Sequence, residues 1–128
     1  MTGAEVQLIV VDAANVVGSR PDGWWRDRAG AARKLLEQLT SLADRLDRPA
    51  AVVVVLEGKA KAADPDVEGV RVVLAEGSGD DAIVDVVAEQ SRARAITVVT
   101  ADRGLRDRVE ALGATTVGPG WLLDRIAP

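Results

Sequence analysis

Five short apolar runs recur along the chain, and between them the apolar residues follow helical spacing. The runs are rich in valine and isoleucine, and they lack the alternation of polar and apolar residues that marks a strand with one solvated face. Runs of this length and composition are typical of strands that are covered on both faces. The sequence therefore predicts five buried strands, at residues 6–11, 50–56, 70–74, 95–100 and 114–117.

The segments between these runs carry helical stripes of apolar residues. Four leucines spaced by four, three and four residues predict a long helix over residues 25–46: Leu35, Leu39, Leu42 and Leu46. Further helices are expected over residues 79–91, around residues 105–112 and from residue 119 onward. The third of these four helices should end at Gly113, since glycine readily adopts a left-handed cap. Residues 57–69 show no such stripe and are expected to form a loop.

Alternation of strands and helices predicts an α/β fold. We expect a three-layer α/β/α sandwich with a mainly parallel central sheet of about five strands. The chain of 128 residues shows no internal repeat and no linker, so residues 1–128 are predicted to form a single domain. In sheets of this kind, ligands bind beyond the carboxyl ends of the strands.

Composition limits the chemistry that can occur there. The sequence contains no cysteine and no histidine, which excludes thiolate zinc sites, cysteine nucleophiles and imidazole bases. Any metal site must use oxygen ligands, which favours Mg²⁺ or Mn²⁺. The net charge of −4 argues against nonspecific DNA binding. Because no apolar run approaches the length of a membrane helix and no signal peptide is evident, we expect a cytoplasmic protein without a membrane partner.

Acidic side chains follow the predicted strands at their carboxyl ends. They are Asp12 after the first strand, Glu57 after the second, Asp80 and Asp81 after the third, and Asp102 after the fourth. Parallel strands bring these ends to one edge of the sheet, where the carboxylates would repel one another unless a cation lies among them. The sequence therefore predicts a metal site at this edge, able to activate water beside a phosphodiester.

Structural roles for the same acids remain open. Asp81 and Ser78 form a capping-box pattern, and Asp102 stands where a helix N-cap is expected. Glu57 is as consistent with a solvated strand end as with a ligand. The prediction of a site depends on their joint placement.

Three sequence motifs resemble those of NYN domains in the PIN-like nuclease superfamily, and they occur in the same order along the chain. The run IVVDAANV at residues 9–16 resembles the opening strand of the family, in which an Asp is followed three positions later by Asn. The run GDDAI at residues 79–83 is similar to its second acidic motif, and VVTADR at residues 98–103 to its third. Trp25, leading into a helix with Arg33, resembles the YacP-like branch. The resemblance covers essentially the whole chain.

This resemblance implies a PIN-like fold and a metal-dependent endoribonuclease, a hydrolase that uses Mg²⁺ or Mn²⁺. Asp12, Asp102 and either Asp80 or Asp81 would be metal ligands, with Asp12, Asp81 and Asp102 as the catalytic set. Asn15 would orient the ligands or contact a substrate phosphate. Metal-bound water would cleave RNA to leave a 3′-hydroxyl and a 5′-phosphate. Glu57, in the run Leu-Glu-Gly where Phe-Asp-Gly is expected, is a further candidate ligand with a longer reach.

Basic and aromatic residues near the acidic edge are candidates for RNA binding. They are Arg20, Lys59 and Arg103, which suit phosphates, and Trp24, which suits stacking on an unpaired base. Trp25 and Trp121 are expected in the core. The expected partner is RNA in single-stranded or loop regions, with the ribosome as a candidate for presenting it. The alternative functions are a non-catalytic relative that binds RNA or a nucleotide, and a toxin-type nuclease.

Overall fold

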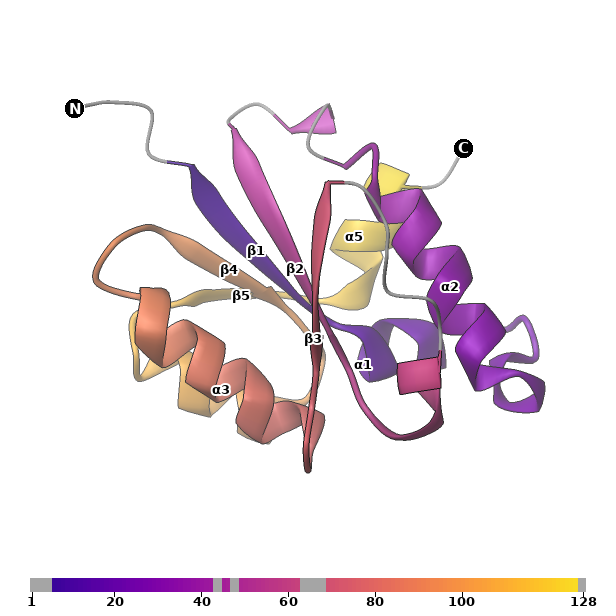
Figure 1. Cartoon of the computed structure of the whole chain (residues 1–128). Coiled ribbons are helices and arrows are strands. Elements are labelled where there is room, and N and C mark those ends of the chain that lie inside the picture. Colours follow the sequence, from indigo (N-terminus) through magenta and orange to yellow (C-terminus); the bar gives the residue numbers. More distant parts are fainter. Residues whose placement is uncertain (1–5, 43–44, 47–48, 63–68, 127–128) are drawn as a thin grey trace.

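The protein has a five-stranded, all-parallel sheet with helices on both faces (Figure 1). This computed structural model describes residues 6–42, 45–46, 49–62 and 69–126. The strand order is β3-β2-β1-β4-β5. The strands are β1 (Gln7–Asp12), β2 (Ala50–Leu56), β3 (Val70–Leu74), β4 (Ile96–Val99) and β5 (Thr115–Val117). The predicted three-layer α/β/α fold is confirmed, and each strand lies within one residue of its predicted range.

Two hydrophobic cores lie on opposite faces of the sheet. Helices α1 (Ala13–Gly18), α2 (Arg28–Leu39) and α5 (Pro119–Ile126) pack on one face. Helices α3 (Gly79–Gln90) and α4 (Arg103–Glu110) pack on the other. Figure 1 shows α2 and α3 on opposite sides of the strands. In β1, Ile9 and Val11 contribute to the first core, whereas Leu8 and Val10 contribute to the second. Both faces of this strand are therefore buried, which explains the absence of polar alternation.

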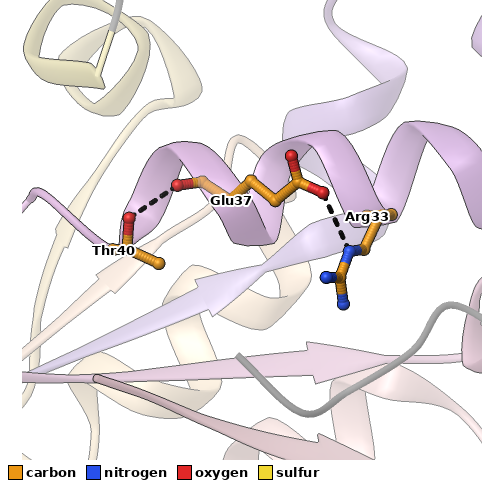
Figure 2. Close-up of polar contacts among 3 residues, drawn as sticks. All are labelled: Arg33, Glu37 and Thr40. Atoms are coloured by element: carbon orange, nitrogen blue, oxygen red, sulfur yellow. Dashed lines mark hydrogen bonds and ion pairs between the residues drawn. The ribbon is translucent and has the colours of Figure 1, made fainter. Parts of the chain in front are cut away.

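The long helix predicted over residues 25–46 is wrong at both ends. Trp24–Arg26 form a separate 3₁₀ turn, η1, and α2 begins only at Arg28, with the Asp27 carboxylate accepting a hydrogen bond from the Gly30 N–H. The helix ends at Leu39, where the Thr40 hydroxyl donates to the carbonyl of Glu37 (Figure 2). The Thr40 N–H donates to the same carbonyl. The leucine stripe nevertheless predicted the buried face, since Leu42 beyond the helix is also fully buried.

Arg33 lies on the outer side of α2. Its Nε pairs with Glu37 Oε1 at 2.9 Å, one helical turn away (Figure 2). This pair contributes little to stability because both side chains are substantially exposed to solvent.

Within the residues that the structure describes, two further short elements, α1 and a 3₁₀ helix, were not predicted. Helix α1 has six residues, which is too short to display an apolar stripe, and it begins directly after Asp12. Within the predicted loop at 57–69, residues Gly58–Ala62 form a 3₁₀ helix, η3. Residues 63–68 of that loop lie outside the described residues. Gly58 has a φ of +58°, a left-handed conformation that glycine adopts without strain.

The strand order places a topological switch point between β1 and β4. After β1 the chain moves outward through β2 to β3, and it then returns to the other side of β1 for β4 and β5. The connections after β1 and β4 therefore diverge to opposite faces of the sheet, which leaves a crevice where open α/β sheets bind ligands. In the part of the chain that the structure describes, no helix combines the length and apolar character needed to cross a membrane.

Candidate active site at the carboxyl edge of the sheet

Asp12 is the buried acid at the switch point. It is the last residue of β1, and it is 5% exposed. Oδ2 accepts a hydrogen bond from the Thr100 hydroxyl at 2.9 Å, and Oδ1 accepts one from the Asn15 N–H at 3.4 Å. The pKa of Asp12 is raised from 3.8 to about 6, chiefly by burial. The two hydrogen bonds lower this pKa, and the negative charges of Asp80 and Glu57 raise it further. Asp12 is therefore a carboxylate whose charge is costly at neutral pH.

Thr100 joins the ends of β1 and β4. It is fully buried, and its hydroxyl donates to Asp12 while accepting from the Asp102 N–H at 3.1 Å. The backbone at Asp102 is thus fixed relative to the carboxylate of Asp12 through one side chain. Sequence analysis missed this residue. The signal that could have found it is a hydroxyl-bearing residue at a strand end, between two valines and an acid.

Asn15 makes a second link across the switch point. Its Oδ1 accepts a hydrogen bond from the Ala101 N–H at 2.8 Å, which ties α1 to the loop between β4 and α4. That loop ends at Asp102, whose Oδ1 caps α4 by accepting from the Leu105 N–H at 2.9 Å. The predicted N-cap role of Asp102 is therefore present, and Asn15 acts on the position of the loop that precedes it.

Glu57 reaches from β2 to the start of α3. Its Oε2 accepts a hydrogen bond from the Gly79 N–H at 2.8 Å, so the carboxylate meets the positive end of the helix dipole. Gly79 is buried, and a Cβ added there would lie 3.0 Å from the carboxylate of Glu57. The two residues are 22 positions apart in the sequence, and the long side chain of Glu57 reaches from β2 to the start of α3.

The structure separates the roles of Asp80 and Asp81. Asp80 is partly buried, and its pKa is raised by desolvation first and then by the negative charges of Asp102 and Glu57. Asp81 instead pairs with Arg108 of α4 at 3.0 Å, and its side chain is 71% exposed. This pairing lowers the pKa of Asp81, as does its contact with Ser78. Asp81 thus fulfils the predicted capping-box position and connects α3 to α4, while Asp80 lies among the other acids.

Four acids form a group linked by electrostatic repulsion, and we refer to it as the carboxylate cluster: Asp12, Glu57, Asp80 and Asp102. Asp12 and Asp80 each interact with Glu57 and with one another, and Asp80 also interacts with Asp102. The neighbouring Asp81 also raises the pKa of Asp80, but it is left out of the cluster because it pairs with Arg108. Among the described residues, however, no three carboxylates converge closely enough to hold a metal ion by themselves. The reason is that Asp12, Glu57 and Asp102 are each held by hydrogen bonds to separate elements.

The donors available in the carboxylate cluster fit a hard cation. All are carboxylate oxygens, and the most buried of them has a raised pKa that a nearby positive charge would lower. Mg²⁺ commonly uses only one or two protein carboxylates and completes its coordination with water and substrate phosphates. The separated arrangement is therefore compatible with a hard divalent cation, and Asp12 and Asp80 are two of its acids that interact electrostatically.

The predicted RNA-binding residues take different positions. Arg103 is exposed at the first position of α4, directly after Asp102. Lys59 and Trp24 line the same pocket beside α1. Arg20 is directed elsewhere, because its guanidinium donates to Gln38 Oε1 of α2 at 2.6 Å. The structure thus brings Lys59 and Trp24 together and gives Arg20 a contact that supports the fold.

Of the two adjacent tryptophans, it is Trp24 that contacts the core and Trp25 that faces solvent. Trp24 is half-buried against the first core, whereas Trp25 is 57% exposed, so the prediction that Trp25 lies in the core is wrong. Their rings meet edge to face with centroids 6.1 Å apart. The separate 3₁₀ turn explains this difference in burial, because it directs Trp24 rather than Trp25 toward α1 and α2. Trp121 packs against the core as expected and stacks with Arg125.

Comparison with known proteins gives similarity in structure. No protein-family model matches this chain, and no curated protein matches it in sequence. The crystal structure of Rae1 (YacP) from Bacillus subtilis superimposes with a TM-score of 0.74 at 20% identity, covering 93% of this chain and 72% of that one. A mutant of the same protein gives a TM-score of 0.65 at 19% identity, covering 94% and 75%. The chain therefore has the fold of Rae1 (YacP), and the resemblance to the YacP-like branch is confirmed for the fold.

Proposed function

We propose that this protein is a metal-dependent endoribonuclease. The observation that carries the proposal is the position of the carboxylate cluster, centred on buried Asp12 at the topological switch point. A buried carboxylate with a raised pKa, surrounded by other acids, is a costly arrangement for structure alone. The similarity in fold to Rae1 (YacP) and the three NYN-like motifs support the same conclusion.

In this proposal Asp12 and Asp80 would hold the metal, and Asp102 and Glu57 would contribute further negative charge to the site. The motif allowed either Asp80 or Asp81 as a metal ligand. We assign this role to Asp80, because Asp81 is paired with Arg108. Thr100 orients the carboxylate of Asp12, and Asn15 positions the loop that leads to Asp102. These two are positioning residues.

A bound Mg²⁺ or Mn²⁺ would supply an activated water and neutralise charge on the phosphodiester. The chain has basic residues to bind the flanking phosphates, namely Arg103 on α4 and Lys59 on η3. With neither histidine nor cysteine in the sequence, an attack without a metal would have no imidazole or thiolate base. RNA in single-stranded or loop regions is the proposed substrate, and the cytoplasm is the proposed location.

Cleavage of end-labelled RNA tests the proposal. Purified protein is incubated with single-stranded, hairpin and ribosome-bound RNAs in Mg²⁺ or Mn²⁺, with EDTA as a control. We expect cleavage that requires the metal and is lost in Asp12→Asn but retained in Asp124→Asn, which changes an exposed acid of α5. RNA binding without cleavage in every arm would instead identify a non-catalytic relative of the same fold.

A further inference from the structure

A pocket of about 300 Å³ lies beside the carboxylate cluster. It is formed by α1, α2, Trp24 of η1 and the start of η3, and Glu57 lies on its border. We propose that this pocket binds one unpaired nucleobase of the RNA, next to the phosphate that is cleaved. This inference rests on the proposed function and specifies its substrate as a strand from which a single base can turn outward.

The lining of the pocket fits a flat aromatic ring. Four alanines with small side chains, from α1, α2 and η3, line the pocket together with the indole of Trp24: Ala13, Ala14, Ala32 and Ala60. The volume lies at the lower end of the range of roughly 300–1,000 Å³ for small-molecule sites, which suits one base better than a larger ligand. Aromatic side chains are the usual platforms for unpaired bases, because every base offers a π-face.

The charges around the pocket suit a nucleotide whose phosphates lie outside it. Arg28 stacks over the ring of Trp24 at 5.3 Å, and Lys59 lines the pocket from η3. Glu57 belongs both to the pocket and to the carboxylate cluster, since it interacts with Asp12 and Asp80. A base in the pocket would therefore place its own phosphate group near the cluster, with two cations beside the strand.

A second hollow lies next to the pocket and offers the strand a path. Trp24 and Ala14 line both, and the second hollow passes Asn15 and Ala101 to reach Gly120 at the start of α5. A single strand can follow this path with one base inserted, whereas a base held in a duplex cannot enter the pocket without unpairing.

Binding measured without metal tests the inference separately from catalysis. Fluorescence anisotropy in EDTA records the affinity for a labelled ten-nucleotide RNA and for a series in which one position at a time is abasic. Ala60→Leu fills the pocket, and Ala88→Leu makes the same change on the exposed side of α3. We expect Ala60→Leu to weaken binding by roughly 5- to 150-fold, the range for loss of one stacked base, and Ala88→Leu to leave it unchanged.

The abasic series identifies the bound base. For the wild-type protein, one position should show a comparable loss of affinity when its base is removed. In Ala60→Leu the same abasic RNA should bind no more weakly than the intact RNA, because the pocket is already closed. Trp24→Leu should reproduce this pattern, while Trp25→Leu, which changes the exposed neighbour, should retain the wild-type pattern. Urea unfolding of each variant establishes that it is folded.

The outcomes separate this inference from the proposed nuclease. Cleavage by the wild-type protein with equal RNA affinity in Ala60→Leu and Ala88→Leu would overturn the base pocket and leave the nuclease intact. Affinity that depends on the pocket, without cleavage in any metal, would support the pocket and reject the nuclease. Tighter binding of a free nucleoside triphosphate than of the RNA would also overturn the inference, because the pocket would then serve a mononucleotide.

Discussion

The Thr100 hydroxyl donates a hydrogen bond to Asp12 Oδ2 at 2.9 Å, between two buried side chains that are 88 positions apart in the sequence. The same hydroxyl accepts from the Asp102 N–H. One oxygen atom therefore connects the ends of the neighbouring strands β1 and β4 and two of the four acids in the carboxylate cluster.

Replacing Thr100 by Val should destabilise the protein by about 1–3 kcal/mol. The shape is preserved, but a buried carboxylate loses a donor and the Asp102 N–H loses its acceptor. Urea unfolding at pH 7 measures the change, and Thr97→Val on the same strand is the matched control. An equal loss in both variants would show that the hydrogen bonds of Thr100 contribute nothing specific.

Asp12→Asn should change the dependence of stability on pH. Because the pKa of Asp12 is about 6 in the folded state and 3.8 is its ordinary value, the folded protein binds more protons between these two pH values. The contribution of Asp12 to the free energy of unfolding is therefore greatest below pH 3.8 and falls as the pH rises to about 6. At ~1.4 kcal/mol per pKa unit, the total change is about 3 kcal/mol.

The Asn variant lacks this titration and keeps an oxygen to accept from Thr100. Its stability relative to the wild type should thus increase by up to about 3 kcal/mol between pH 4 and pH 7. Urea unfolding of both proteins at several pH values gives this difference. For Asp81→Asn, the stability relative to the wild type should change with pH in the opposite direction. Arg108 lowers the pKa of Asp81, so the stability that the wild type gains from this pair is lost as the pH falls. A difference between Asp12→Asn and wild type that is constant with pH would contradict the prediction.

The neighbouring acids at the start of α3 should differ in their effect on RNA cleavage. Asp80→Asn removes a member of the carboxylate cluster, and we expect at least a ~100-fold loss of metal-dependent activity. Asp81→Asn removes the pair with Arg108 and should retain most of it. Rates at saturating Mn²⁺, together with a titration of the metal, distinguish the two. The reverse ranking would assign the ligand to Asp81, as the motif alone also allowed.

Gly79→Ala should be destabilising, whereas Gly77→Ala should not. A Cβ at position 79 would approach the carboxylate of Glu57 to 3.0 Å and weaken its hydrogen bond to the Gly79 N–H, at a cost of about 1 kcal/mol. At position 77, nothing lies within 4 Å of an added Cβ. Thermal unfolding compares the variants with Glu57→Gln, which tests the same contact from the other side. Equal midpoints for the two glycine variants would exclude a structural role for Glu57 at α3.

The layers of the fold and the edge at which the acids gather could both be predicted from the amino-acid pattern. Runs of valine and isoleucine without polar alternation can only be satisfied by burial on both faces, and a parallel sheet places every strand end that is followed by an acid on one side. The stripe of leucines in the first long helix was equally informative about its buried face. Its ends were not, because Thr40 and the turn at Trp24 depend on local hydrogen bonds that periodicity does not report.

The differences among the acids depend on contacts between elements that are distant in the sequence. Asp80 and Asp81 are adjacent and chemically identical, and their roles separate because α4 places Arg108 beside one of them. Thr100 gained its importance from a strand 88 residues away, and Glu57 from a helix start 22 residues away. Such contacts depend on where side chains from different elements meet in space. Spacing along a single chain determines which edge a residue reaches, but burial and charge at that edge depend on every element packed around it.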